Sequence, residues 1–248
     1  MPVLIANNVL ACLPRKVYQE LSPLLVPADL EFGQVLYREG ERMKEVYFPQ
    51  SCVVSLLVVV DRDAALEVAL VGRDGLLGIP LALGAELSPV RALVQGAGAA
   101  LRMSRARFRA ALEEHASLRE AVYNYGGSLM GQIGQTAACN RFHQVNARLA
   151  RWLLMTRDRL GSAEFRVTQA FLSAMLGVRR VGVSEAASSF QHRHLIEYSR
   201  GVITILDHPG LETACCSCYA VDTARAGAMA KWRPPLAGAA GLAVTSVH

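Results

Sequence analysis

The segment from Thr168 to Gln191 constrains the fold of this chain more than any other stretch of its sequence. Residues 168–178 predict a short helix that begins with a threonine cap and ends at Gly177, which can take the left-handed conformation that a tight turn needs. Residues 179–191 predict a second helix. Four residues at suitable offsets would form the shared core of the pair: Leu172, Leu176, Val183 and Ala186. This combination predicts a helix-turn-helix.

A hairpin pattern follows the second helix. Residues 195–198 and 202–206 are strand-like, and Ser199-Arg200-Gly201 separates them as a turn. A helix-turn-helix with a hairpin is a winged helix. Winged helices favour duplex DNA, because one helix can enter the major groove while flanking cations hold phosphates. The alternative is a winged helix that mediates only protein contacts.

The distribution of charge supports an anionic partner for this part of the chain. The net charge is +5, and residues 141–200 hold ten arginines against four acidic residues. Such local excess suits nucleic acid, although a solvated basic face is an alternative. We expect Arg180 to read a guanine, since it stands with Arg179 at the start of the second helix. The full set of expected DNA contacts is Thr168, Gln169, Arg179, Arg180, Ser184, Gln191, Arg193 and Arg200.

The first half of the chain has a different pattern. Short runs of β-branched and aromatic residues between residues 30 and 101 predict an antiparallel sandwich or barrel. The fold class is therefore α+β. The glycine-rich segment 72–78 is the only candidate ligand loop in this half.

A long helix is predicted between these two parts. Ser117 and Glu120 have the spacing of a capping box, which marks its start. Apolar residues then recur at intervals of four, three and four, a heptad spacing: Leu118, Val122, Tyr125 and Leu129. We interpret them as a dimer interface, with ordinary packing on the chain's own β-domain as the alternative.

The six cysteines are too scattered for a secreted disulfide framework. Cys215, Cys216 and Cys218 could bind a soft metal or oxidise, but no four-ligand set at zinc or iron–sulfur spacing is complete in the sequence. The histidines offer no placed haem ligand. The expectation is therefore no metal and no cofactor.

Residues 10–219 resemble the cyclic AMP receptor protein/FNR family of bacterial transcription regulators. Residues 176–183 and 195–201 carry the most specific part of the resemblance, and residues 30–49 are similar to the family's β-roll. The resemblance implies an N-terminal β-roll, a dimerisation helix and a C-terminal winged helix-turn-helix. It also implies a homodimer on an inverted-repeat operator, with recognition helices about 34 Å apart, and makes RNA polymerase a candidate partner.

Departures from the family pattern bear on the effector. Nucleotide-binding relatives carry a Gly-Glu pair in the β-roll, whereas Ile79 and Pro80 follow Gly78 here. The effector is unknown, and we expect that it is not cyclic AMP. The candidate ligand pocket is formed by Gly75, Gly78, Arg91 and Ala92. Cys12 stands alone at the N-terminus, which argues against an oxygen-sensing iron–sulfur cluster. Glu185 and His194 also depart from common family residues, so the preferred operator should differ.

These observations divide the chain into a β-roll at 1–116, a dimerisation helix at 117–140, a winged helix-turn-helix at 141–219 and a flexible tail at 220–248. The sequence shows no enzyme fingerprint and no stretch long enough to span a membrane, so we expect a cytoplasmic DNA-binding regulator. The alternative is an effector-independent interaction protein that uses the β-roll and has lost DNA binding.

Overall fold

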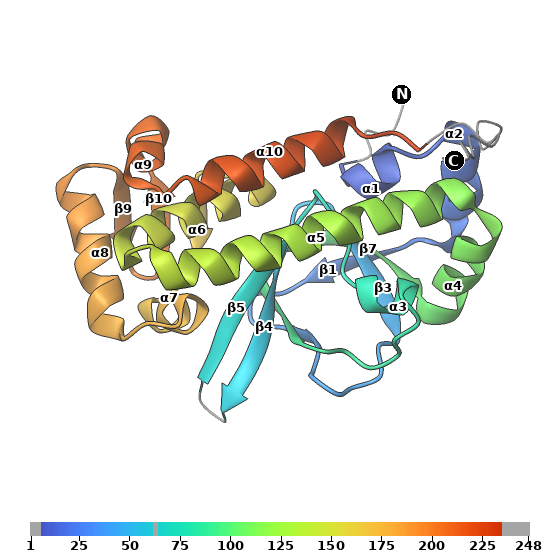
Figure 1. The fold of residues 1–248 in the computed structure, drawn as a ribbon, viewed down its shortest axis with the longest axis horizontal. Coiled ribbons are helices and arrows are strands. Elements are labelled where there is room, and N and C mark those ends of the chain that lie inside the picture. Colours follow the sequence, from blue (N-terminus) through green and yellow to red (C-terminus); the bar gives the residue numbers. More distant parts are fainter. Residues whose placement is uncertain (1–5, 62–63, 235–248) are drawn as a thin grey trace, which may run out of the picture.

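A computed structural model describes residues 6–61 and 64–234, and it shows two units joined by a long helix (Figure 1). The N-terminal unit contains two antiparallel sheets, with strand orders β1-β7-β3 and β2-β6-β4-β5. Its strands are β1 (Val26–Leu30), β2 (Val35–Tyr37), β3 (Glu45–Pro49), β4 (Val53–Asp61), β5 (Ala64–Val71), β6 (Arg91–Gly96) and β7 (Gly98–Ser104). Its helices are α1 (Asn8–Ala11), α2 (Arg15–Leu21), a 3-10 helix (Ser22–Leu24), α3 (Ile79–Ala82) and α4 (Arg105–Glu114). The expected antiparallel β-unit is confirmed.

The long helix α5 (Ala116–Phe142) runs along both units. It ends where His143 takes an extended conformation, and α6 (Val145–Leu160) begins two residues later. The predicted helix at 117–140 is therefore confirmed and slightly longer. Its predicted start is wrong in detail, because Ser117 lies inside the helix and the actual N-cap residue, His115, makes no side-chain cap. Among the described residues, none of the helices combines the length and the hydropathy needed to cross a membrane.

The C-terminal unit is the expected winged helix-turn-helix. Its elements after α6 are β8 (Glu164–Arg166), α7 (Gln169–Leu176), α8 (Arg180–His192), β9 (Ile196–Ser199), β10 (Val202–Ile205) and α9 (His208–Ala214). The three strands form one antiparallel sheet in the order β8-β10-β9. Leu172, Leu176, Val183 and Ala186 are buried in a common core, as the helix-turn-helix prediction requires.

The core of the C-terminal unit continues into the β-unit. Val53, Leu57 and Leu70 from β4 and β5 belong to the same buried cluster as the helix-turn-helix residues. Trp152 of α6 donates a hydrogen bond of 2.9 Å from Nε1 to the buried carboxylate of Glu67 on β5. Gln95 of β6 also donates a buried hydrogen bond of 3.2 Å from Nε2 to Oγ1 of Thr156 on α6. The two units are thus packed together through both apolar and buried polar contacts.

The expected flexible tail from residue 220 is wrong for the described part of that segment. Residues Cys218–Lys231 form helix α10, which runs antiparallel to α5 and packs along it (Figure 1). Alanine is frequent up to residue 230 and favours a helix, while the prolines that suggested a flexible chain begin only at residue 234. The remainder of the predicted tail, residues 235–248, lies outside the described residues.

Candidate nucleic-acid interface and neighbouring sites

Helix α7 begins at a side-chain cap. The Oγ1 of Thr168 accepts a hydrogen bond of 3.1 Å from the backbone N–H of Phe171. Thr168 is one of the expected DNA contacts, and in the structure its side chain caps the start of the helix. Such an exposed helix start carries unsatisfied N–H groups, which suit a phosphate oxygen.

The turn between α7 and α8 is tight. Gly177 ends α7 in the left-handed conformation, with φ of 60°. The Oγ of Ser173 donates a hydrogen bond of 2.5 Å to the carbonyl of Val178, which closes the turn. Arg148 of α6 donates to the carbonyl of Leu176 and satisfies the end of α7. These contacts fix the direction in which α8 leaves the turn.

The first residues of α8 present two free cations. Arg179 is the N-cap, Arg180 is the first helical residue, and both side chains are exposed. Within the described part of the chain neither arginine pairs with a carboxylate, whereas many other arginines do. Ser184 donates a hydrogen bond of 2.8 Å to Oε1 of Gln169, so these two predicted contacts lie side by side. Gln191 is exposed near the other end of the helix.

The wing carries the remaining predicted cations. The β9–β10 turn has positive φ at both Arg200 (50°) and Gly201 (76°), as two-residue hairpins often have, and Arg200 is exposed at its tip. Arg193 caps the C-terminal end of α8 and is also exposed. Tyr198 donates to the carbonyl of Val167 over 3.0 Å and fastens the hairpin to the start of α7.

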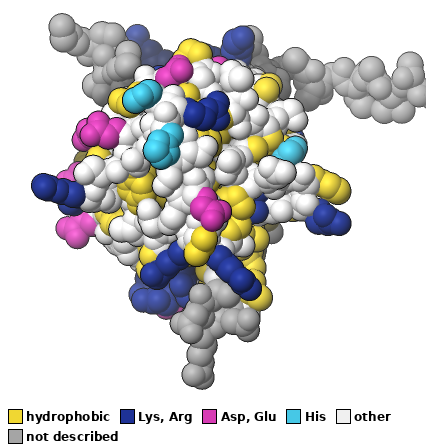
Figure 2. Space-filling model, turned by 90° about the vertical axis from the view of Figure 1, so that its left-hand side faces the viewer, with side chains coloured by type: hydrophobic (Ala, Val, Ile, Leu, Met, Phe, Trp, Pro, Cys, Tyr) yellow, Lys and Arg dark blue, Asp and Glu magenta, His cyan; other side chains and the backbone are white. Residues whose placement is uncertain are grey.

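These residues share one end of the molecule, the end where α8 lies in Figure 1. Figure 2 views this end and shows Lys and Arg side chains projecting from it, several of them gathered in the lower half of the face.

One exposed residue of α8 was missed by sequence reasoning. Val181 is 67% exposed, although it is apolar and lies on an ordered helix beside Arg180. The signal was present in the sequence, because Val181 lies off the core stripe that Val183 and Ala186 define. An exposed aliphatic group on a helix of this kind can contact the methyl group of thymine.

The basic excess at 141–200 is smaller at the surface than the sequence indicated. Arg148, Arg151 and Arg159 are all buried. Arg151 pairs with Asp222 at 2.7 Å, and Arg159 pairs with Asp74 at 2.8 Å. These three arginines stabilise the fold and are not available to an external anion.

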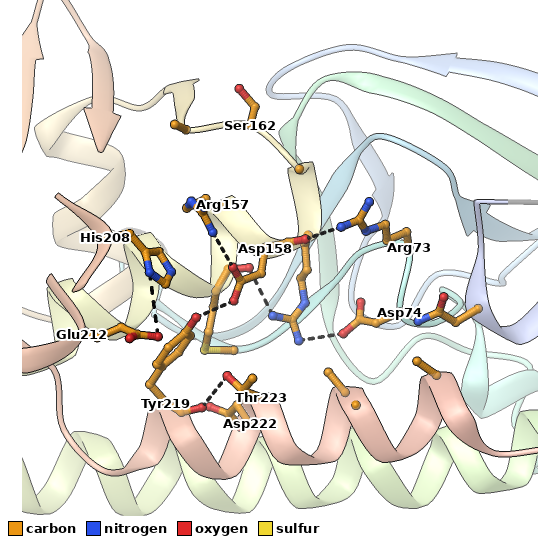
Figure 3. A pocket seen from close by; sticks show the side chains of 18 residues that line it. Arg73, Asp74, Arg157, Asp158, Ser162, His208, Glu212, Tyr219, Asp222 and Thr223 are labelled. Carbon is orange, nitrogen blue, oxygen red and sulfur yellow. Dashed lines mark hydrogen bonds and ion pairs between the residues drawn. The ribbon is translucent and has the colours of Figure 1, made fainter. Parts of the chain in front are cut away.

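A cleft of about 720 Å³ lies where α6, α10 and the β-unit meet (Figure 3). Tyr219 donates to Oδ2 of Asp158 over 2.7 Å, and Arg73 donates to the backbone carbonyl of the same residue. Arg159, which also lines the cleft, pairs with Asp74. Burial and hydrogen bonding to Asp158 raise the pKa of Tyr219, with burial the larger cause. Arg73 and Asp74 of the expected ligand segment 72–78 therefore hold the β-unit against α6.

The candidate ligand pocket is only partly as expected. A second cavity, of about 410 Å³, lies between the β-unit and α5, and Gly78 lines it. Gly75, Arg91 and Ala92 do not line it: Gly75 packs directly against the ring of Tyr125, and Ala92 is fully buried. None of the described residues that line the cavity is charged.

The residues that were expected to form the dimer interface face the chain's own β-unit. Leu118, Val122, Tyr125 and Leu129 are buried in the core of the chain's own β-unit, so they are unavailable to a partner. The heptad spacing was identified correctly, but it describes the packing of α5 on the same chain. Sequence periodicity alone cannot distinguish these two neighbours.

A different face of α5 is open. Its exposed residues also follow intervals of four and three: Tyr123, Gly127, Met130, Gly134 and Ala137, named here the outer seam. Met130 is 71% exposed, and a side chain at either glycine would meet open space. A stripe of exposed apolar and small residues at this spacing is typical of a helix that pairs with another helix.

The cysteines near residue 216 have further neighbours. Cys139 and His143 on α5 lie with Cys216 and Cys218, and the four ligand atoms are all within 4.8 Å of one another. The expectation that no four-ligand set is completed is therefore wrong. The sequence could not show the set, because its two halves lie more than seventy residues apart. Hydrogen bonds from Cys139 and Cys215 lower the pKa of the Cys216 thiol.

Comparison with known proteins adds to this geometry. Residues 147–214 match the model of the Crp-like helix-turn-helix domain. A comparison with curated proteins found no match.

Solved structures share the fold of about three quarters of this chain. FixK2 from Bradyrhizobium japonicum has a TM-score of 0.64 at 13% identity, covering 77% of this chain and 98% of that one. CLP, a c-di-GMP responsive global regulator from Xanthomonas campestris, has a TM-score of 0.62 at 16% identity, covering 77% and 99%. A transcriptional regulator of the CRP family from Thermus thermophilus has a TM-score of 0.61 at 20% identity, covering 75% and 95%. This chain therefore combines a Crp-like helix-turn-helix domain with the fold of the Crp/Fnr family of transcriptional regulators.

Proposed function

We propose that this chain is a homodimeric, sequence-specific DNA-binding transcription regulator that places α8 in the major groove. The observation that carries the proposal is the pair of exposed arginines at the start of α8, Arg179 and Arg180, within a matched Crp-like helix-turn-helix domain. A helix start in the major groove brings its first side chains to the base edges.

Base reading is assigned to one exposed strip of α8. In this proposal Arg180 donates two hydrogen bonds to a guanine, and the adjacent Val181 contacts a thymine methyl group. Glu185, also exposed on this helix, accepts a hydrogen bond from a cytosine amino group in this proposal. Phosphates repel a carboxylate at this position, so binding is weakened unless a cytosine amino group pairs with it. This requirement narrows the range of operator sequences that the protein tolerates.

Phosphate contacts are assigned to the periphery of the same face. Arg200 at the tip of the wing and Arg193 at the end of α8 are exposed cations. Thr168 and Gln169 at the start of α7 offer N–H groups to a further phosphate. Such contacts fix the orientation of the protein on the duplex without reading sequence.

Dimerisation is assigned to the outer seam of α5. Two copies of this seam would cover Met130 and Tyr123, which are otherwise exposed, and Gly127 and Gly134 would let the two backbones approach closely. A two-fold dimer presents two copies of α8 to an inverted-repeat operator.

The cavity between the β-unit and α5 suits an uncharged, apolar effector better than a cyclic nucleotide. Its described lining is aliphatic and aromatic, and the phenol of Tyr37, one of its few polar groups, already donates to the carbonyl of Glu45 over 2.5 Å. A cyclic phosphate needs a cation or several N–H donors, and an apolar wall would leave it unpaired.

The experiment that tests the proposal begins with selection of bound duplexes from a randomised pool. The selected duplex is then titrated by fluorescence anisotropy at two salt concentrations with wild type and Arg180→Ala. We expect an inverted-repeat sequence, a steep loss of affinity with salt, and a loss of roughly 1–3 kcal/mol with relaxed preference at one base pair for Arg180→Ala.

The matched control is Arg107→Ala, which removes an exposed arginine from α4 in the other unit and changes the net charge equally. Its affinity should equal that of wild type. If the purified protein enriches no duplex with or without apolar ligands, or if affinity barely depends on salt, the alternative of an interaction protein that uses the β-unit gains support.

A further inference from the structure

The Cys/His cluster described above is formed by two separate segments. Cys139 and His143 are one helical turn apart near the end of α5, so their side chains lie on the same face. Cys216 and Cys218 lie at the start of α10 and flank Ser217. The sulfur atoms of Cys139 and Cys216 are 3.6 Å apart, and the sulfur of Cys218 is 3.5 Å from Nδ1 of His143.

These separations match the edges of a single metal-centred tetrahedron. With zinc–sulfur and zinc–nitrogen bonds of about 2.3 Å and 2.0–2.1 Å, a tetrahedron has sulfur–sulfur edges of about 3.8 Å and sulfur–nitrogen edges of about 3.5 Å. An iron–sulfur cluster needs its cysteine sulfurs farther apart, because several iron and sulfide atoms lie between them. The geometry therefore favours one ion over a cluster.

We propose that Cys139, His143, Cys216 and Cys218 bind one zinc-class divalent cation as a closed, tetrahedral Cys₃His site. Binding releases to solvent the protons that the three cysteines still carry and leaves a site with a net charge of minus one from three thiolates, one neutral imidazole and a dication. Neither oxidation nor reduction takes place.

The surroundings suit a negatively charged metal–thiolate centre. The guanidinium of Arg151 lies beside Cys139, and Arg148 lines the same small cavity as Cys139, so two cations from α6 lie near this ligand. Gln135 donates a hydrogen bond of 3.0 Å from Nε2 to the sulfur of Cys218. Amide donors to ligand sulfurs of this kind orient the ligands of protein metal sites.

The position of the site indicates which segments a bound ion would hold together. Its α5 ligands adjoin the bend between α5 and α6, where the long helix meets the C-terminal unit. Its other ligands begin α10, which returns along α5. The bound ion holds these segments together and thereby fixes the orientation of the C-terminal unit relative to the outer seam.

The test uses the full chain, purified with a thiol reductant and without chelator. We expect about one zinc per chain by elemental mass spectrometry and, after exchange to cobalt(II), the intense visible bands of tetrahedral cobalt with thiolate charge-transfer absorption. Cys218→Ser and His143→Gln should each lose the zinc or bind it much more weakly.

The matched control is Cys215→Ser. Cys215 is adjacent to the ligands in sequence, but its thiol lies 3.7 Å from the carbonyl of Ala147 and outside the ligand set. This variant should retain the wild-type zinc content. Equal loss in Cys215→Ser and Cys218→Ser would overturn the assignment of ligands.

Two measurements on wild type keep the proposal falsifiable if a variant does not fold. Absence of zinc after incubation with one equivalent and gel filtration would overturn it. So would octahedral cobalt bands without charge transfer, or a thiol titration that shows a Cys139–Cys216 disulfide as the stable state.

Discussion

Arg151 of α6 and Asp222 of α10 form a buried ion pair, with 2.7 Å between Nη2 and Oδ2 and 2.8 Å between Nε and the same oxygen. The guanidinium also donates to Oγ1 of Thr136 on α5 over 3.1 Å. Arg151 thus connects three helices, and one of them is the segment that the sequence predicted to be flexible. The pair explains why α10 has a defined place along α5.

Removing one partner of this pair should be strongly destabilising. In Asp222→Ala the guanidinium of Arg151 stays buried without its counter-charge, so we expect the free energy of unfolding to fall by about 3–5 kcal/mol. Urea denaturation followed by circular dichroism measures the change. Asp29→Ala, which removes an exposed carboxylate from β1, should change stability by less than about 0.5 kcal/mol. Equal effects of the two substitutions would show that the pair contributes nothing specific.

The proposed dimerisation through the outer seam predicts a substitution that should separate the two copies. Met130→Glu would bring two carboxylates together near the two-fold axis and should convert the dimer to a monomer with an unchanged circular dichroism spectrum. Sedimentation equilibrium measures the oligomeric state. Leu87→Glu, at another exposed apolar residue, is the control and should stay dimeric. A dimer that survives Met130→Glu would assign dimerisation to another surface.

The carboxyl of Glu67 predicts a pH dependence of stability. Burial raises its pKa from 4.5 to about 7, although Ser55, Trp152 and nearby arginines favour the charged form. Because the folded pKa is raised, the protonated carboxyl stabilises the fold fully below about pH 4.5, and this contribution is lost as pH rises through about 7.

Glu67→Gln should remove this dependence and keep an acceptor for Trp152. The free energy of unfolding of wild type minus that of Glu67→Gln should fall by up to about 3 kcal/mol from about pH 4.5 to about pH 7.5. Above that pH the difference should stay constant. Urea denaturation across this range measures it, with Glu113→Gln on the exposed face of α4 as control. A difference that rises with pH would contradict the assignment.

The apolar cavity predicts the outcome of nucleotide binding. Cyclic AMP at millimolar concentration should leave the melting temperature unchanged, since no described residue of the lining offers a cation to the phosphate. Differential scanning fluorimetry measures the shift. A saturable increase in melting temperature that disappears in Arg91→Ala would show that Arg91 reaches a bound phosphate after all.

The sequence predicts what depends on local pattern. Gly177, the core residues around Val183 and the capping threonine specify the helix-turn-helix within some twenty residues, so its boundaries were found almost to the residue. The same holds for the extent of α5, where the heptad interval from Leu118 to Leu129 is a local signal of a helix with one buried face.

What depends on distant partners could not be predicted. The period of Leu118 and Val122 says that one face of α5 is buried, but not against which neighbour. Arg151 looks like a surface cation until Asp222 is placed beside it. Cys139 and His143 become ligand candidates only when α10 folds back along α5. In each case the deciding contact joins segments that no sequence window contains.

Backbone strain is present just before the wing. His194 has φ of 53°, a left-handed conformation that costs a residue with a side chain roughly 1–2 kcal/mol, and it is exposed. Glycine takes this conformation without that cost, although it loses more entropy on folding. His194→Gly should therefore raise the free energy of unfolding by about 1 kcal/mol, whereas His194→Ala should not raise it. Urea denaturation of both variants measures the difference in stability. If His194→Gly also binds the selected duplex with wild-type affinity, the histidine is not a DNA contact. Equal stability of the glycine and alanine variants would mean that the conformation carries no strain.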